Sequence, residues 1–213
     1  MLDSKYITHD DLHDFPQAVW LKQFLIGHPG IIAGGCFRSV FMGEKPHDLD
    51  MFFHDVGEYR QAVQYFRAAK DKYLPGYQNK NVESFIHLES KTRIECVKTI
   101  FGTPEEILDQ FDFTIAKFAI CIEPEPPDLP HDDWTYNELI TYHPFFFEHL
   151  SMKRLVVDDE MPFPVSTFNR CFKYAARGFF PCRETKLKIL RAINELPNVE
   201  DGDLSKAMYE GHD

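Results

Sequence analysis

The sequence has no long apolar run. No stretch approaches the roughly 18 uninterrupted apolar residues that a membrane-spanning helix needs. The first residues also lack the basic start and apolar segment that mark a secretory signal. Cysteine is scarce: the five cysteines are an odd number at wide, irregular spacings, which fits neither a disulfide framework nor a paired-cysteine zinc site. We therefore expect a cytoplasmic protein with reduced thiols and no membrane partner.

Basic residues are also in short supply. There are 23 Lys and Arg against 34 Asp and Glu, a formal charge of −11, which disfavours a protein that wraps nucleic acid over its whole surface. The cations that are present gather near the C-terminus. Between residues 153 and 191 there are nine basic and four acidic residues, a local charge of +5. This segment could hold a polyanion.

The composition is that of a folded globular protein. The chain has 213 residues, of which 44% are apolar and 27% are charged, and this length suits one domain or a tight pair. The apolar patterns predict a mixed α/β region followed by a mostly helical one. A Pro-rich acidic stretch at 123–130 can be neither helix nor inner strand. We therefore expect an α/β domain over residues 1–125 and a mainly helical domain over residues 126–213.

Apolar periodicity and capping signals predict the individual elements. Strands are expected at 30–33, 48–53, 82–88, 92–99 and 135–142. Helices are expected from Thr8 to Gly27, after the glycines at 34–35, at 57–73, from Thr103, at 166–178 and at 184–196. In the helix at 166–178 we expect an inward face made of Phe168, Phe172, Ala175 and Ala176.

The most informative segment joins a strand, a glycine turn and a pair of carboxylates. Residues 34–39 read Gly-Gly-Cys-Phe-Arg-Ser, and Asp48-Leu-Asp50 follows nine residues later. Residues i and i+2 of a strand face the same side, so Asp48 and Asp50 would project together. Such a pair suits Mg²⁺ or Mn²⁺, which prefer oxygen ligands and can activate a hydroxyl while stabilising a leaving pyrophosphate. The double glycine allows backbone to approach a triphosphate closely.

These motifs, in this order, resemble the nucleotidyltransferase superfamily. Within it, the chain resembles the head domain of the class II tRNA nucleotidyltransferases (CCA-adding enzymes) and bacterial poly(A) polymerases. Their Gly-Gly-x-Val-Arg-Asp and Asp-x-Asp pattern corresponds to residues 34–39 and 48–50 here, and their Arg-Arg-Asp-Phe-Thr-Ile-Asn-Ala corresponds to Gln-Phe-Asp-Phe-Thr-Ile-Ala-Lys at 110–117. A fainter similarity to the family's arginine-rich neck lies at 170–179, so head and neck are covered over roughly residues 18–180.

The resemblance implies a nucleotidyltransferase palm with a small mixed sheet, followed by a helical neck. It implies metal-dependent transfer of a nucleoside monophosphate from an NTP to a hydroxyl, with a tRNA-like RNA 3′ end as acceptor. The implied catalytic carboxylates are Asp48, Asp50 and Glu95, of which Asp48 and Asp50 hold the metal. The implied nucleotide-binding residues are Gly34, Gly35, Arg38, Ser39 and Asp112. The implied RNA-binding residues are Lys117, Arg154, Arg170, Lys173 and Arg177.

The chain departs from the family pattern at several places. Gln110 and Phe111 replace the paired arginines that help to hold the nucleotide, Ala116 replaces an asparagine, and Ser39 replaces an aspartate. There is no Glu-Asp-x-x-Arg motif of the kind that selects cytosine and then adenine. Faithful CCA synthesis is therefore not predicted, and any RNA contact is expected to be smaller than that of the complete enzymes.

The residues themselves leave alternatives open. Glu95 is a third catalytic carboxylate or a partner of Arg93 or Lys98. Arg38 reaches phosphate or ties down its own turn, and Asp112 orients the nucleotide or caps a local turn. The proposed RNA-binding cations could instead form a solvated helix face, which is the commoner role of such charges.

Two other functions remain open on this evidence. The first keeps the chemistry but transfers the nucleotide to a protein or a small molecule. The second is a non-catalytic interaction protein on the same fold.

Overall fold

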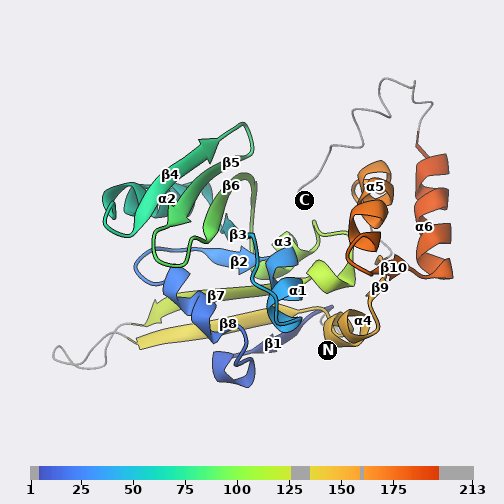
Figure 1. Ribbon diagram of the computed structural model, residues 1–213, viewed down its shortest axis with the longest axis horizontal. Helices are drawn as coiled ribbons and strands as arrows, with labels where there is room; N and C mark the ends of the chain where they lie inside the picture. The colour runs from blue at the N-terminus through green and yellow to red at the C-terminus, as the bar shows by residue number, and fades with distance from the viewer. Residues whose placement is uncertain (1–4, 126–134, 159–160, 197–213) are drawn as a thin grey trace.

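A mixed sheet of eight strands organises the computed structural model (Figure 1), which describes residues 5–125, 135–158 and 161–196. In spatial order the strands are β1 (Ile7–His9), β8 (Thr135–Tyr142), β7 (Phe118–Glu125), β2 (Ile31–Ala33), β3 (Asp48–Phe53), β6 (Arg93–Phe101), β5 (Val82–His87) and β4 (Tyr73–Gln78). Only β3 and β6 run parallel; the other neighbours are antiparallel. The mixed α/β class predicted from the sequence is confirmed.

Helices cover both faces of the sheet. The α-helices are α1 (Gly35–Phe41), α2 (Val56–Ala68), α3 (Pro104–Leu108), α4 (Phe146–Ser151), α5 (Pro164–Ala175) and α6 (Arg183–Asn194). Short 3₁₀ turns are η1 (Leu12–Asp14), η2 (Val19–Phe24) and η3 (Thr114–Ala116), and a small parallel pair joins β9 (Arg154–Leu155) to β10 (Phe180–Pro181). None of the described helices is long and apolar enough to cross a membrane.

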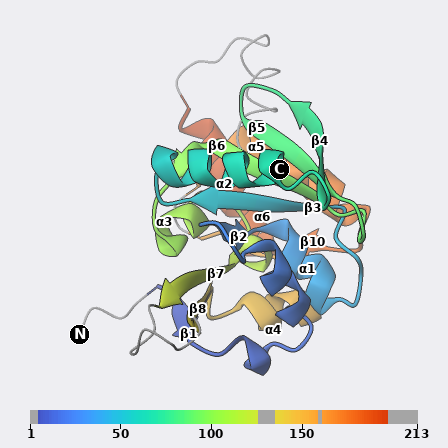
Figure 2. The same ribbon diagram turned by 90° about the vertical axis from the view of Figure 1, so that its left-hand side faces the viewer.

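The alternation of side chains along the central strands separates two cores. Leu49, Met51 and Phe53 of β3 join the larger core, which α1, α2, α4 and η2 complete. Phe52 joins the smaller core on the other face, together with Ile107 of α3. Because the period of a strand is two residues, Asp48 and Asp50 must face the same side as Phe52. This periodicity places both carboxylates on the α3 face of the sheet. In the view of Figure 2, α2 lies above β3 and α3 lies below it.

The Pro-rich region begins inside a strand. β7 pairs with β2 only from Ala119 to Cys121, but it pairs with β8 along its whole length, including Pro124 opposite Tyr136. Pro124 therefore has a neighbouring strand on one side only, a position in a sheet that proline tolerates. Residues 126–130 of the stretch lie outside the described residues. Because β8 belongs to the same sheet, the sheet continues past residue 125, where we expected the first domain to end.

Two local predictions need correction. The segment predicted as a helix from Thr8 to Gly27 contains the end of β1 and two 3₁₀ turns, with Pro16 between them. The helix expected at 57–73 ends at Ala68, and β4 follows with Tyr73 as its first residue. By contrast, the helix expected from Thr103 is confirmed as α3, and Thr103 caps it in a capping box: its hydroxyl accepts from the Glu106 amide, and the Glu106 carboxylate accepts from the Thr103 amide.

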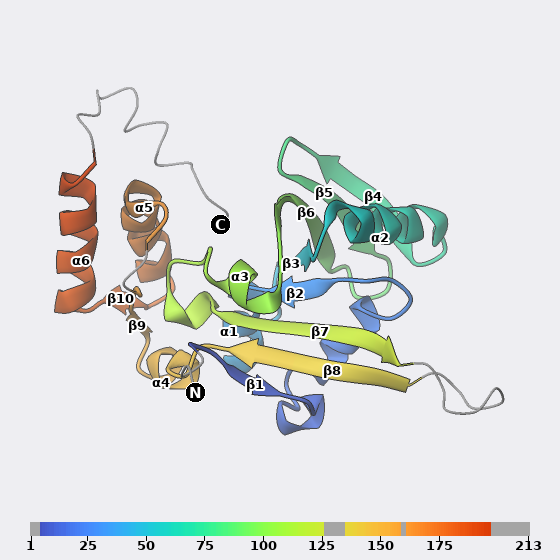
Figure 3. The ribbon, with the colours of Figure 1, turned by 180° about the vertical axis from the view of Figure 1, so that it is seen from behind.

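Helix α5 turns the opposite face inward from the one we predicted. Phe168 and Phe172 are 43% and 64% exposed, whereas Thr167, Arg170 and Cys171 are buried. Figure 3 shows α5 and α6 side by side beyond one end of the sheet. The polar groups on the inner face of α5 are satisfied locally or across the interface, since Thr167 Oγ1 donates to the Phe163 carbonyl and Arg170 forms an ion pair. The reversed face brings the cations of α5 toward the sheet.

Candidate active site

A polar cleft of about 380 Å³ lies where β3 and β6 begin, bounded by α1 on one side and α5 on the other. It brings together most of the residues singled out in the sequence. Those that line it are Gly35, Arg38, Ser39, Asp48, Asp50, Glu95, Asp112, Arg170, Lys173 and Arg177. Gly34 forms the turn that leads into it. The cleft therefore combines carboxylates from the sheet with cations from two helices.

The carboxylates are arranged by strand register. Asp48 and Asp50 lie two residues apart on β3, and in the parallel pairing with β6 Asp50 is opposite Glu95. All three side chains line the cleft. Glu95 Oε1 accepts a hydrogen bond from the Tyr77 hydroxyl at 2.7 Å, and Arg93 lies 4.0 Å from the same oxygen. Glu95 thus faces the aspartates and is also held by neighbours on its other side.

Tyr77 is a site residue that sequence reasoning missed. It lines the cleft from β4, and its ring lies beneath the Arg93 guanidinium at 5.5 Å. Burial and the hydrogen bond to Glu95 raise the pKa of Tyr77 to about 12. The phenol therefore stays protonated and keeps donating to Glu95 at neutral pH. Only the pairing of β4 with β5 brings it there, so no local motif could have indicated it.

Close packing leaves no room for a side chain at the glycine turn. Gly34 has φ 93°, a left-handed conformation that side chains disfavour, and a Cβ at this position would lie 2.8 Å from the Phe111 ring. The same Cβ position is 3.7 Å from Asp50 Oδ2. Glycine is therefore required both by the backbone conformation and by the space between Phe111 and the carboxylate. Phe111, which replaces an arginine of the family pattern that the sequence resembles, supplies an apolar wall to the cleft.

Arg38 is positioned by two side chains and not by the carbonyls of its own turn. One terminal nitrogen donates to Ser39 Oγ at 3.1 Å, and the guanidinium lies 5.2 Å from the ring centroid of Tyr174. Tyr174 comes from α5, so this contact joins the first helix of the sheet region to the helical region. Arg38 is only 7% exposed.

Asp112 and Arg170 form a buried ion pair between the sheet region and α5. Asp112 is 3% exposed and Arg170 is 7% exposed. Burial raises the pKa of the Asp112 carboxyl, while Arg170 acts in the opposite direction. Asp112 therefore does not cap a local turn; it anchors α5 at the cleft. Arg170, which we expected on an RNA-binding surface, is buried and pairs with Asp112.

The prediction for Lys117 is wrong. Its side chain is fully buried, and its Nζ lies 2.5 Å from Asp158 Oδ2. His143 Nε2 lies 3.3 Å from the other oxygen of Asp158. Lys117 therefore cannot reach RNA. Arg154 is exposed but belongs to β9 and does not line the cleft, so of the five expected RNA-binding residues only Lys173 and Arg177 are both exposed and at its wall.

The donors in the cleft fit a hard divalent cation. Asp48 and Asp50 offer carboxylate oxygens on one face of one strand, the ligand type that Mg²⁺ and Mn²⁺ prefer. Glu95 is the candidate third carboxylate, opposite Asp50.

A second group of potential ligand atoms lies elsewhere, where Asp11, His13 and Glu138 approach within 4.8 Å. Glu138 already accepts from Lys22 Nζ and from the Leu12 amide, each at 2.6 Å, and Asp11 accepts from His13. Hydrogen bonds within the protein therefore explain why these three side chains lie close together.

Comparison with known proteins identifies the family. A profile described as Gabija anti-defense 2 family protein matches residues 11–153, more than half of the chain. The chain belongs to the Gabija anti-defense 2 family. A curated relative from Bacillus phage SPbetaL7, named Gabija anti-defense 2, is 21% identical over 179 residues, which are 83% of this chain and 40% of the relative. The chain thus spans well under half the length of that relative.

Solved structures with a similar fold are CCA-adding enzymes. The complex of a CCA-adding enzyme with CTP matches with a TM-score of 0.59 and 17% identity over 89% of this chain and 47% of that chain. The Thermotoga maritima CCA-adding enzyme complexed with tRNA matches with a TM-score of 0.56 and 18% identity over 97% of this chain and 52% of that one. These likenesses establish a nucleotidyltransferase-like fold for the family member described here, over about half of each solved chain.

Proposed function

We propose that this Gabija anti-defense 2 family member is a metal-dependent nucleotidyltransferase that acts against Gabija defence. The observation that carries the proposal is the register of β3 against β6, which faces Asp48 and Asp50 toward Glu95 in a cleft whose opposite wall carries cations. A nucleotidyltransferase-like fold with this arrangement supports transfer of a nucleoside monophosphate from an NTP to a hydroxyl. The name of the curated phage relative supports the role in anti-defence.

Each element of the cleft has a chemical role in this proposal. Asp48 and Asp50 would hold Mg²⁺ or Mn²⁺, which when bound supplies charge stabilisation for the attacking hydroxyl and the leaving pyrophosphate. The backbone at Gly34 and Gly35 would approach the phosphates, because no Cβ obstructs it. Arg38, held by Ser39 and Tyr174, would contact the polyphosphate from α1. Glu95 would act as the third carboxylate, and Asp112 would fix α5 against the nucleotide through Arg170.

The acceptor that we propose first is an RNA 3′ end. Lys173 of α5 and Arg177, just beyond the end of that helix, are exposed and line the cleft, so a phosphate backbone entering there would meet two cations. The departures at Gln110, Phe111 and Ala116 argue against CCA synthesis as such. We therefore propose transfer to an RNA 3′ end without synthesis of the CCA sequence.

A protein acceptor is the second candidate. The burial of Lys117 and Arg170 leaves fewer cations for RNA than the sequence suggested, and an anti-defence role fits modification of a defence protein. The chemistry at the cleft is the same in both cases. A side-chain hydroxyl would take the place of the ribose hydroxyl.

The test is a labelling experiment with each α-³²P-labelled NTP in turn, Mg²⁺ or Mn²⁺, and a mixture of cellular RNA and protein from a Gabija-carrying host. We expect label in RNA with the wild-type chain and none with Asp48→Asn/Asp50→Asn. Asp71→Asn, which changes an exposed carboxylate far from the cleft, is the matched control and should label as the wild type does. Label in protein instead of RNA would establish the second acceptor. Absence of both label and metal-dependent NTP binding would overturn the enzymatic proposal.

A further inference from the structure

A second pocket lies at the opposite end of the same central strands. The active-site cleft is at the end of β2 and the start of β3, whereas this pocket is at the start of β2, beyond the end of β3 and along β7. Its volume is about 560 Å³, within the range of roughly 300–1,000 Å³ that small-molecule sites occupy. The lining includes Leu25, His28, Pro29, His54, Glu58, Gln61, Cys121, Ile122, Glu123 and Tyr136. None of these residues takes part in the proposed transfer reaction.

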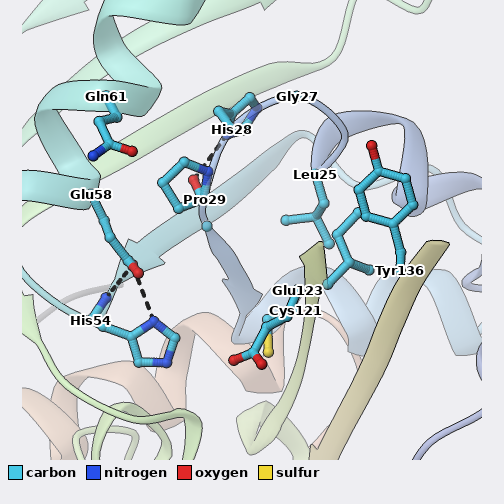
Figure 4. Close-up of a pocket in the computed structure, with 12 residues that line it drawn as sticks. Leu25, Gly27, His28, Pro29, His54, Glu58, Gln61, Cys121, Glu123 and Tyr136 are labelled. Carbon is cyan, nitrogen blue, oxygen red and sulfur yellow. Dashed lines mark hydrogen bonds and ion pairs between the residues drawn. The ribbon is translucent and has the colours of Figure 1, made fainter. Parts of the chain in front are cut away.

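The pocket has an apolar base. Leu25, Cys121 and Ile122 are buried, and the ring of Tyr136 is half-buried on the β8 side. Figure 4 shows Tyr136 on one side of the pocket, with His54 and Glu58 on the other. A ligand with a flat or compact apolar body would therefore contact side chains below and beside it.

The charged groups on the wall are all of one sign. Glu58 and Glu123 line the pocket, and no Lys or Arg is found among its lining residues. Glu58 Oε2 accepts from the His54 amide at 2.9 Å and from His54 Nδ1 at 3.1 Å, and no described residue engages Oε1. The hydrogen bonds to Oε2 thus fix the orientation of the carboxylate, and Oε1 is available to a ligand in the pocket. This arrangement favours a cation over an anion.

His28 contributes a neutral ring to the wall. The residue is 9% exposed, and its Nδ1 lies 2.9 Å from the Pro29 carbonyl, which can only accept. Burial lowers the pKa of His28, so the ring adds no positive charge at neutral pH. The other ring nitrogen, Nε2, is buried, and a ligand in the pocket would not reach it.

We propose that this pocket binds a small organic cation: an amidinium, guanidinium or amine carried on a compact apolar body. The apolar base accommodates the body, and Glu58 and Glu123 attract the charge. The site is independent of the proposed transfer reaction, because the two pockets share no lining residue.

The test uses three probes of nearly identical shape that differ in charge: benzamidine, benzamide and benzoate. Each is titrated into the full chain without NTP and followed by ligand-observed NMR. We expect saturable binding of benzamidine, binding of benzamide about tenfold weaker, and no binding of benzoate, since one charge pair of this kind is worth about a factor of ten. Equal binding of benzamidine and benzamide, or no saturable binding of any probe, would overturn the proposal.

Substitutions of residues that line the pocket test whether benzamidine binds there. Glu58→Gln and Glu123→Gln should each weaken benzamidine about tenfold and reduce its advantage over benzamide. Glu89→Gln removes an exposed carboxylate away from both pockets and should leave binding unchanged. Gln61→Trp, which fills the pocket from the exposed face of α2, should abolish binding without lowering Tm. Benzamidine binding that survives both Glu58→Gln and Gln61→Trp would place the ligand elsewhere and overturn the assignment, whereas Asp48→Asn/Asp50→Asn should bind benzamidine as the wild type does.

Discussion

The guanidinium of Arg38 lies over the ring of Tyr174, 5.2 Å from its centroid, and this contact joins α1 to α5 across the candidate active site. Both residues line the cleft, so the helical region supplies part of the wall against which a nucleotide would bind. Residues of the sheet region and of the helical region therefore line the same cleft.

Loss of the Tyr174 ring should weaken nucleotide binding. A cation–π contact that is partly desolvated is worth about 1–2 kcal/mol, so we expect Tyr174→Leu to raise the Kd for NTP about tenfold. Tyr174→Phe keeps the ring and should stay within about twofold of the wild type, since 1.4 kcal/mol corresponds to a factor of ten. Fluorescent-NTP titration in the presence of Mn²⁺ measures both variants. Equal loss in the two variants would show that the hydroxyl, and not the ring, positions Arg38.

The buried pair of Asp112 and Arg170 should make single substitutions costly. Arg170→Met leaves the Asp112 carboxylate buried without its partner, and we expect a loss of about 3–5 kcal/mol in the free energy of unfolding. The double substitution Asp112→Leu/Arg170→Met removes both charges and should recover most of that loss. Urea denaturation of the two single variants and the double variant measures the coupling. If the single losses simply add in the double variant, the two residues do not act as a pair.

The free energy of unfolding should also decrease at acid pH because of the ionisation of Asp158. Burial by itself would raise the pKa of Asp158, but the hydrogen bonds from His143 and Lys117 outweigh it and hold the pKa below the usual 3.8. A carboxyl whose pKa is lower in the folded state stabilises the protein above its unfolded pKa and loses this contribution as pH falls through the folded value. The contribution should therefore be full above about pH 4 to 5 and should decline below.

Asp158→Asn provides the comparison for this pH dependence. It leaves the Lys117 ammonium buried without its partner, so we expect about 3–5 kcal/mol of destabilisation near pH 7. The difference between wild type and variant should shrink as the pH falls below about 4, because the carboxyl of the unfolded wild type then binds a proton that the folded state does not. Urea titrations at several pH values measure it. A constant difference down to pH 2 would contradict the role assigned to the carboxylate charge.

The exposed aromatic pair on α5 should contribute little to folding. The ring centroids of Phe168 and Phe172 are 5.3 Å apart, and both residues are exposed, so Phe168→Ser and Phe172→Ser should each change the free energy of unfolding by less than about 1 kcal/mol. Phe113→Ala, which removes a fully buried ring, should cost about 3–5 kcal/mol. Urea denaturation of the three variants measures these changes, which are read from the transition midpoints when the m-values are equal. A large loss at Phe172 would mean that the ring is covered in solution.

Local patterns in the sequence determined much of the candidate site. The two-residue period of a strand was enough to place Asp48 and Asp50 on one face, and the capping box at Thr103 was enough to place the start of α3. The requirement for glycine at position 34 also follows from backbone sterics, although the sequence could not say that Phe111 is the ring it accommodates. These features depend on a few neighbouring residues.

The tertiary structure alone decided which charges and rings meet. Lys117 and Asp158 are 41 residues apart, and Tyr77 reaches Glu95 only because β4 completes the sheet, so neither pairing leaves a local trace. The spacing of Phe168 and Phe172 is as regular on an exposed face of a helix as on a buried one. Which face of α5 is buried depends on the partner it meets, and here Asp112 supplies a buried charge that draws Arg170 inward. Amphipathic spacing fixes the two faces of a helix, whereas long-range packing and the pairing of buried charges choose between them.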